Sequence, residues 1–182
     1  MTDLELLTNG DEGADALVIL AHGAGAPMDS PFMEIVATGL GALGLAVWRF
    51  EFPYMAGRRV DGKKRGPDRE PKLLDAWRRV FTGAEKAGWD RRRIVIGGKS
   101  MGGRMASLVA DELSPRGLVC LGYPFHPPGK PDRLRTAHLV DLKTPTLICQ
   151  GERDTFGTRE EIETLELSPR IAFTWLPDGN HD

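Results

Sequence analysis

The 182-residue sequence predicts an α/β fold, a doubly wound and mostly parallel sheet of about six strands with helices on both faces and no cap domain. Six short apolar runs alternate with stretches of helical periodicity, which is the order of repeated strand–helix units. The runs are nearly continuous in apolar residues, as in strands whose two faces are both covered. The length allows one buried core and is too short for two ordinary domains, so we expect a single domain over residues 1–182.

The predicted strands occupy residues 16–21, 46–50, 93–97, 117–121, 146–150 and 171–176. The first helix follows Ser30 and Pro31, a cap and a first-turn proline. The second opens at Pro71 and stops at Gly88. A third is expected over residues 102–113, before a Ser-Pro pair, and a weaker fourth over residues 158–165.

Two connections, residues 54–72 and 122–143, are longer than a compact α/β unit needs. Each follows the carboxyl end of a predicted strand, where open α/β sheets place ligands. The sequence leaves two interpretations of the first connection open, a solvated loop or a mobile rim that attracts acidic substrates or a partner. Its seven basic residues are Arg58, Arg59, Lys63, Lys64, Arg65, Arg69 and Lys72.

The composition excludes several partner classes. Hydrophobic residues make up 41% of the chain, charged residues 27%, and the formal net charge is −2. This balance gives no reason to expect nucleic acid or an anionic membrane as a partner. No apolar run approaches the roughly 20 residues that span a bilayer, and the start of the chain lacks the pattern of a signal peptide. We therefore expect a cytoplasmic protein.

The two cysteines, Cys120 and Cys149, lie in runs predicted as buried strands. In a chain without an export signal, we expect both to be reduced and to serve packing. Neither belongs to a metal-ligand pattern, so the sequence predicts no metal site.

The segment around Ser100 carries the strongest functional signal. The apolar run Ile-Val-Ile at 94–96 leads into Gly98-Lys-Ser-Met-Gly102, and a helical pattern follows. This Gly-x-Ser-x-Gly turn between a strand and a helix forces its central residue to positive φ and exposes the side chain. Glycines two residues before and after the serine are required because the strand and helix backbones nearly touch. Ser100 is therefore the predicted nucleophile.

A phosphate-binding loop is the competing interpretation of Gly98-Lys99-Ser100. That motif requires a glycine five residues before the Gly-Lys-Ser element, and this sequence has Arg93 there. The predicted strand also runs directly into the turn and leaves no loop to wrap phosphates. We therefore favour the nucleophile over a nucleotide site.

A serine nucleophile needs a histidine base and a carboxylate that orients it. In hydrolases with this turn the order is serine, acid, histidine, each after a successive strand. Asp154 follows the strand at 146–150 and His181 follows the strand at 171–176, so they are the predicted acid and base. Asp141 is the fallback acid, although it precedes its strand. Glu152 and Asp178 are weaker alternatives.

The glycine-rich loop that begins at His22 predicts an oxyanion hole. Its backbone N–H groups are able to approach a reacting carbonyl, with Ala24 the first candidate donor and Gly25 the second. Met101 N–H would be the partner from the serine turn. His22 itself is expected to bond loop backbone instead of acting as a base.

Four residues are predicted to surround the substrate: His22, Tyr54, Tyr123 and His126. They lie at or near the carboxyl ends of predicted strands. His138, the remaining histidine, is expected at the surface.

Together these segments resemble the α/β-hydrolase superfamily over essentially the whole chain. Residues 22–27, 52–54, 97–104 and 151–154 are similar to a narrower dienelactone-hydrolase-like branch that includes testis-expressed and chromatin-complex subunit homologues. Lys99 before the serine and the Gly-Gly-Arg after it are the most specific marks. The resemblance implies a serine triad and no cofactor, and it implies no particular substrate.

Superfamily members carry a final helix after the histidine, and this sequence stops one residue past His181. We expect either that this helix lies outside the sequence or that the histidine sits on a loosely held end.

The sequence therefore predicts a serine hydrolase that cleaves a small ester, thioester or lactone through an acyl-enzyme. Its partner is expected to be a small acyl substrate. The alternative is a catalytically silent interaction module with the same fold, which the basic segment 54–72 and the scaffold role of some similar proteins suggest. The acyl group, the leaving group and the oligomeric state stay open.

Overall fold

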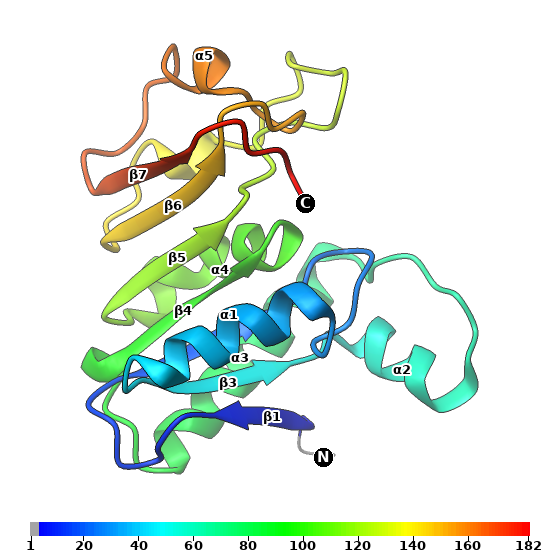
Figure 1. Cartoon of the computed structure of the whole chain (residues 1–182), viewed down its shortest axis with the longest axis vertical. Helices are drawn as coiled ribbons and strands as arrows, with labels where there is room; N and C mark the ends of the chain where they lie inside the picture. Colours follow the sequence, from blue (N-terminus) through cyan, green and yellow to red (C-terminus); the bar gives the residue numbers. More distant parts are fainter. Residues whose placement is uncertain (1–3) are drawn as a thin grey trace.

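A seven-stranded sheet forms the centre of the computed structural model, which describes residues 4–182 (Figure 1). Residues 1–3 lie outside the described residues. They belong to the start of the chain, for which the sequence predicts no signal peptide. The strand order is β1-β3-β2-β4-β5-β6-β7. The pair of β1 and β3 is antiparallel and all other pairs are parallel. The predicted α/β class with a mostly parallel sheet is confirmed.

The strands are β1 (Leu6–Asn9), β2 (Leu17–Ala21), β3 (Ala46–Phe50), β4 (Ile94–Lys99), β5 (Gly117–Leu121), β6 (Thr146–Gly151) and β7 (Ile171–Leu176). Six of them match the predicted runs, three with the same ends and three with ends that differ by one or two residues. The seventh, β1, corrects the expected number of strands. This four-residue edge strand is only partly buried, so its sequence lacks the long apolar run that marks the others.

The helices are α1 (Pro31–Ala42), α2 (Pro53–Asp61), α3 (Glu70–Lys86), α4 (Met101–Leu113) and α5 (Arg159–Ile162). Short 3₁₀ turns occupy Arg91–Arg93 and Ala137–Leu139. The fourth predicted helix is shorter than expected, and a capping box between Thr158 and Glu161 fixes its start.

Helix α2 corrects the interpretation of residues 54–72 as a loop throughout. Its first residue is Pro53, and prolines favour the first turn of a helix. Its last residue, Asp61, is followed by Gly62, which caps the helix with a left-handed backbone of φ 69°. Few apolar residues recur along it, so hydrophobic periodicity provides no helix signal there. The proline and the glycine are the signals that could have located it.

Helices lie on both faces of the sheet: α1 crosses one face, and α3 and α4 cover the other (Figure 1). The larger part of the core lies on the α3 and α4 side, where Phe50 packs edge-on against Trp77 at 4.8 Å between ring centroids. On the other side Met33 and Ala37 of α1 pack on the β2 and β3 half of the sheet. Leu147 and Leu176, on this face of β6 and β7, are 39% and 48% exposed.

The two cysteines differ in burial. Cys120 is buried and Cys149 is only partly buried, and both are free thiols. Burial raises the pKa of each thiol.

Among the described residues, no helix has both the length and the apolar character needed to span a membrane.

A matched pair of leucines tests the position of the core. Leu17 of β2 is 0% exposed and Leu43, at the end of α1, is 79% exposed. We expect Leu17→Ala to lower the free energy of unfolding by about 2–5 kcal/mol, because it leaves a cavity in the sheet. We expect Leu43→Ala to change it by less than about 0.5 kcal/mol. Urea denaturation followed by circular dichroism measures both, and equal losses would contradict this core.

Candidate active site

Ser100 is the single residue between β4 and α4. Its backbone has φ 50° and ψ −117°, which confirms the positive φ that the turn motif predicts. Hydrogen bonds hold this unfavourable conformation from both sides. Ser100 N–H donates to the Leu121 carbonyl at 2.9 Å, and the Ser100 carbonyl accepts from Arg104 N–H at 3.0 Å.

The two glycines of the motif lie against the backbone of β2. A Cβ atom on Gly98 would lie 2.1 Å from the carbonyl oxygen of Ala21, and one on Gly102 would lie 2.4 Å from the same atom. No side chain fits at these distances. The predicted reason for both glycines, a close approach of backbones, is confirmed.

The structure brings Ser100, His181 and Asp154 together from the ends of three strands. His181 Nε2 lies 2.8 Å from Ser100 Oγ, and His181 Nδ1 lies 2.7 Å from Asp154 Oδ2. An ionised carboxylate only accepts hydrogen bonds, so Nδ1 carries the proton. The lone pair of Nε2 then faces the serine hydroxyl.

Asp154 is fully buried and its oxygens are satisfied. Oδ2 also accepts from Gln150 Nε2 at 3.0 Å, and Oδ1 accepts from Phe156 N–H at 2.8 Å. These donors fix the carboxylate in a position from which it holds the imidazole.

The alternative acids lie elsewhere. Glu152 pairs with Arg159 at 2.9 Å, and Asp178 is exposed beside Arg153. Asp141 precedes β6 and so lies toward the opposite end of that strand from Asp154.

Several contacts hold His181 in place. The Phe156 ring stacks on the imidazole with centroids 4.1 Å apart. The Gly179 carbonyl accepts from Arg153 N–H at 2.9 Å, which ties the preceding turn to the loop after β6. The Lys99 ammonium donates to the His181 carbonyl. His181 is therefore packed and hydrogen-bonded.

Lys99 is a half-buried cation next to the serine. Its Nζ lies 4.9 Å from the centroid of the Phe32 ring. Burial lowers the pKa of Lys99, and the charges of Asp154 and Asp182 partly oppose this shift.

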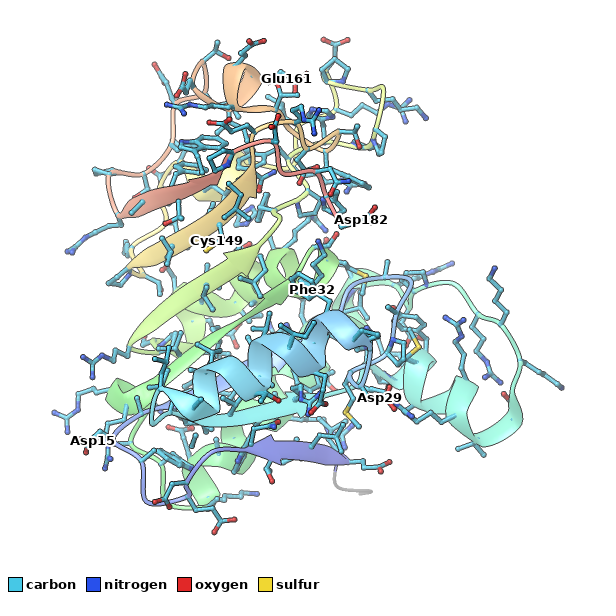
Figure 2. The ribbon with its side chains drawn as sticks, in the orientation of Figure 1. Asp15, Asp29, Phe32, Cys149, Glu161 and Asp182 are labelled. Atoms are coloured by element: carbon cyan, nitrogen blue, oxygen red, sulfur yellow. The ribbon has the colours of Figure 1, made fainter. Side chains whose placement is uncertain are left out.

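A cavity of about 430 Å³ opens beside Ser100 and His181. Its walls come from the loop at 23–26, the start of α1, the serine turn and the loop after β6. Figure 2 shows two of its lining residues, Phe32 and Asp182, at the same edge of the sheet. A larger hollow of about 580 Å³ lies between β1, β3 and α3, and its lining contains none of the three residues Ser100, His181 and Asp154.

Two of the predicted oxyanion donors, Ala24 and Gly25, line this cavity. The third, Met101, is the first residue of α4 and follows Ser100 directly. The N–H groups of the first helical turn have no acceptor within the helix, and they favour negative charge. The predicted donors therefore come from the loop after β2 and from the start of α4.

His22 is fully buried and bonds only backbone. Its Nε2 accepts from Phe52 N–H at 3.1 Å, so Nδ1 carries the proton and donates to the Gly23 carbonyl at 2.6 Å. Burial lowers the pKa of His22, so the ring stays neutral. The expected structural role of His22 is confirmed.

The predicted substrate-contacting set is corrected by the structure. His22, Tyr54, Tyr123 and His126 are all buried, and none of them lines the cavity. The hydroxyl of Tyr123 donates to the Arg135 carbonyl at 2.9 Å, and His126 lies 3.4 Å from Glu161.

The cavity has other walls, which the sequence did not reveal. They include Pro31, Phe32, Met33, Lys99 and Phe156. The apolar side chains at the start of α1 recur with the period of a helix that faces the core. An apolar residue that lines a cavity follows the same period, so the sequence pattern does not distinguish the two positions. Lys99 stands out in the sequence only as part of the motif.

His138 is also corrected, because it is half-buried instead of at the surface. Its Nε2 lies 2.8 Å from Ser107 Oγ. Burial, with a contribution from Arg104, lowers the pKa of His138 to about 4. Within residues 4–182, no group of three histidine, cysteine, aspartate or glutamate side chains is arranged to hold a metal ion.

The comparisons with known proteins concern the family and the fold. The sequence model of the alpha/beta hydrolase domain family matches residues 14–182. An alpha-beta serine hydrolase homologue from Coxiella burnetii is 22% identical with a TM-score of 0.77, covering 98% of this chain and 83% of its own. A serine hydrolase without lid from Xanthomonas campestris is 21% identical with a TM-score of 0.69, covering 98% and 80%.

A dienelactone hydrolase from Anabaena variabilis is 22% identical with a TM-score of 0.70, covering 98% of this chain and 82% of its own. At these identities the similarity concerns the fold. The narrower resemblance to testis-expressed and chromatin-complex proteins stays a prediction.

Two glycine substitutions test the close approach at the serine turn. We expect Gly102→Ala to lower the free energy of unfolding by about 2 kcal/mol or more, because its Cβ would overlap the Ala21 carbonyl. A Cβ on Gly83 of α3 would have nothing within 4 Å, so Gly83→Ala should raise stability by about 0.5–1 kcal/mol. Urea denaturation of both variants measures the difference. A neutral Gly102→Ala would show that the backbones are not in contact.

The buried histidine at 138 predicts a pH dependence. Its pKa is about 4 when folded and near the ordinary value of 6.5 when unfolded. Between these values the unfolded chain binds the proton more strongly, so stability falls as the pH drops from about 6.5 to 4. We expect His138→Gln to make this fall in stability shallower. Burial also lowers the pKa of His22, so His22 contributes a fall of the same sign, which the substitution leaves unchanged. Unfolding curves at closely spaced pH values measure the slope, and parallel profiles would contradict the assignment.

Proposed function

The chain belongs to the alpha/beta hydrolase domain family, and we propose that it is a serine hydrolase that transfers an acyl group to water through Ser100, His181 and Asp154. One observation carries the proposal: hydrogen bonds of 2.7 and 2.8 Å link a buried carboxylate through an imidazole to a serine hydroxyl. This arrangement turns a weakly nucleophilic hydroxyl into an effective one.

The chemistry follows from these positions. Ser100 Oγ attacks the carbonyl carbon of the substrate while His181 Nε2 takes its proton. Asp154 stabilises the imidazolium, which then protonates the leaving alcohol or thiol, and an acyl-enzyme forms. Water enters, loses a proton to His181 and attacks the acyl carbon. The imidazolium then returns this proton to Ser100 Oγ as the acyl–oxygen bond breaks, which releases the acid and restores Ser100 and His181.

The oxyanion of each tetrahedral intermediate needs preorganised donors. Met101 N–H comes from the start of α4, and Ala24 N–H, with Gly25 as the second candidate, comes from the loop after β2. Donors of this kind contribute roughly 3 kcal/mol each to transition-state stabilisation. The helix dipole of α4 adds to the same field.

The cavity supports a substrate class of small esters, thioesters or lactones. Its volume is about 430 Å³, and Phe32, Met33 and Phe156 give it apolar walls suited to a short acyl chain. The structural neighbour named a dienelactone hydrolase supports a carboxylic-ester or lactone substrate. The steps above use only side chains, backbone groups and water. The proposed partner is a small acyl substrate.

Labelling with a fluorophosphonate probe tests the nucleophile. We expect the wild-type protein to be labelled at Ser100 and Ser100→Ala to lose labelling. Hydrolysis of a p-nitrophenyl ester of a short acid should fall at least ~10³-fold in Ser100→Ala and in His181→Ala. In Asp154→Asn we expect a loss of about 10³–10⁴-fold, because an amide favours the wrong imidazole tautomer.

Ser107→Ala is the matched control, because Ser107 lies on the same helix and contacts His138 instead of His181. It should be labelled and active like the wild type. Folded wild-type protein that is neither labelled nor active would overturn the proposal. It would favour the alternative of a silent interaction module with the hydrolase fold.

A further inference from the structure

Two consecutive peptide carbonyls of the loop after β2 are held by buried side chains. His22 Nδ1 donates to the Gly23 carbonyl at 2.6 Å, and the Tyr54 hydroxyl donates to the Ala24 carbonyl at 2.8 Å. In a planar trans peptide the C=O and the following N–H point in opposite directions. The Ala24 N–H therefore points away from His22, and the Gly25 N–H points away from the Tyr54 hydroxyl.

Ala24 and Gly25 both line the cavity that contains Ser100, whereas His22 and Tyr54 are buried behind the loop. Both carbonyls are thus tied on the buried side of the loop. Both N–H groups are left for the cavity side, where the oxyanion of the proposed reaction would form.

The Ala24–Gly25 peptide depends on its carbonyl hydrogen bond more than the Gly23–Ala24 peptide does. Gly25 has nothing within 4 Å of the position a Cβ would take, and glycine accepts either sign of φ at little cost. The Ala24–Gly25 peptide is therefore free to rotate unless something fixes its carbonyl. The Tyr54 hydroxyl is the side-chain donor that the structure places on that carbonyl.

Tyr54 is itself firmly placed. It lies in the first turn of α2, where its N–H donates to Asp68 Oδ2 at 2.8 Å. Its ring is buried edge-on against His22, with centroids 5.8 Å apart. Burial raises the pKa of Tyr54 well above its usual range, so the hydroxyl keeps its proton and remains a donor.

We propose that Tyr54 is a positioning residue of the reaction: its hydroxyl fixes the Ala24–Gly25 peptide so that the Gly25 N–H joins the oxyanion hole. The inference rests on the proposed function, since it assigns a role within the same site. It makes Gly25 a working donor together with Ala24. It also gives α2, in the segment expected to be a solvated loop or a mobile rim, a part in the chemistry.

Tyr123 provides a matched control. The chain has only two tyrosines, and both are buried with hydroxyls that donate to a backbone carbonyl. The acceptor of Tyr123 is the Arg135 carbonyl, in a segment that does not line the cavity. Removing either hydroxyl leaves one partly buried backbone carbonyl without its side-chain donor, so the effects on stability should be similar.

The test compares Tyr54→Phe with Tyr123→Phe on a short p-nitrophenyl ester, measuring kcat, KM and the inhibition constant of a trifluoromethyl ketone. The ketone forms a tetrahedral oxyanion adduct with the serine. We expect Tyr54→Phe to lower kcat about 10-fold, with KM within twofold, and to weaken the ketone about 10-fold, because a donor used mainly in the transition state is partly lost. Tyr123→Phe should leave all three within about twofold.

A second variant tests the mechanism and does not depend on stability. Alanine at position 25 disfavours positive φ, so Gly25→Ala should resist rotation of the peptide. In a Gly25→Ala background, we expect the kcat loss from Tyr54→Phe to shrink from about 10-fold to about threefold or less. A merely structural tyrosine would show the same loss in both backgrounds.

The outcomes separate the two proposals. Equal losses in Tyr54→Phe and Tyr123→Phe, a change confined to KM, or an undiminished loss in the Gly25→Ala background would overturn the role of Tyr54. Absence of ester hydrolysis and of fluorophosphonate labelling in the wild type would instead overturn the proposed function.

Discussion

The site depends on the contact between the backbone of β2 and the turn that joins β4 to α4. One carbonyl oxygen, that of Ala21, lies where any side chain at Gly98 or Gly102 would have to go. Because nothing separates these backbones, α4 begins directly above the sheet and Ser100 takes its positive φ. The same contact brings the glycine-rich loop after β2 next to the serine. Ser100, the proposed nucleophile, and the loop proposed to stabilise the oxyanion are therefore positioned by one steric constraint.

Polar groups of the neighbouring strand β3 complete the support of that loop. Arg49 Nη1 donates to the Met28 carbonyl at 3.0 Å, and Glu51 accepts from Met28 N–H at 3.2 Å. Both side chains are buried and both are paired, Arg49 with Glu34 and Glu51 with Arg59. Buried charges persist only when they are paired and hydrogen-bonded, so this network fixes the segment between β2 and α1. Its role is geometric, since none of these charges touches the reacting atoms.

The sequence predicted the parts of this structure that follow from local chemistry. Parallel strands covered on both faces are apolar runs, and strand-end positions brought Ser100, Asp154 and His181 to one edge. What it missed depends on tertiary context. The edge strand β1 is short and half-buried, and α2 carries few apolar residues on which a period could be recognised. Tyr54 and Phe32 could not be sorted between core and cavity, because burial depends on which neighbours fold over a side chain.

The edge position of β7 has a consequence for how the site is assembled during folding. Among the described residues this strand pairs only with β6, and the segment that follows it holds His181, which is far from Ser100 in sequence. Bringing distant segments together loses chain entropy before their contacts form, so such pairings tend to come late. The turn that holds Ser100 belongs to the centre of the sheet, whereas His181 follows the edge strand β7. Regain of the Ser100–His181 hydrogen bond therefore reports the pairing of β7 with β6, and a chain in which only the central strands had formed would still lack this contact.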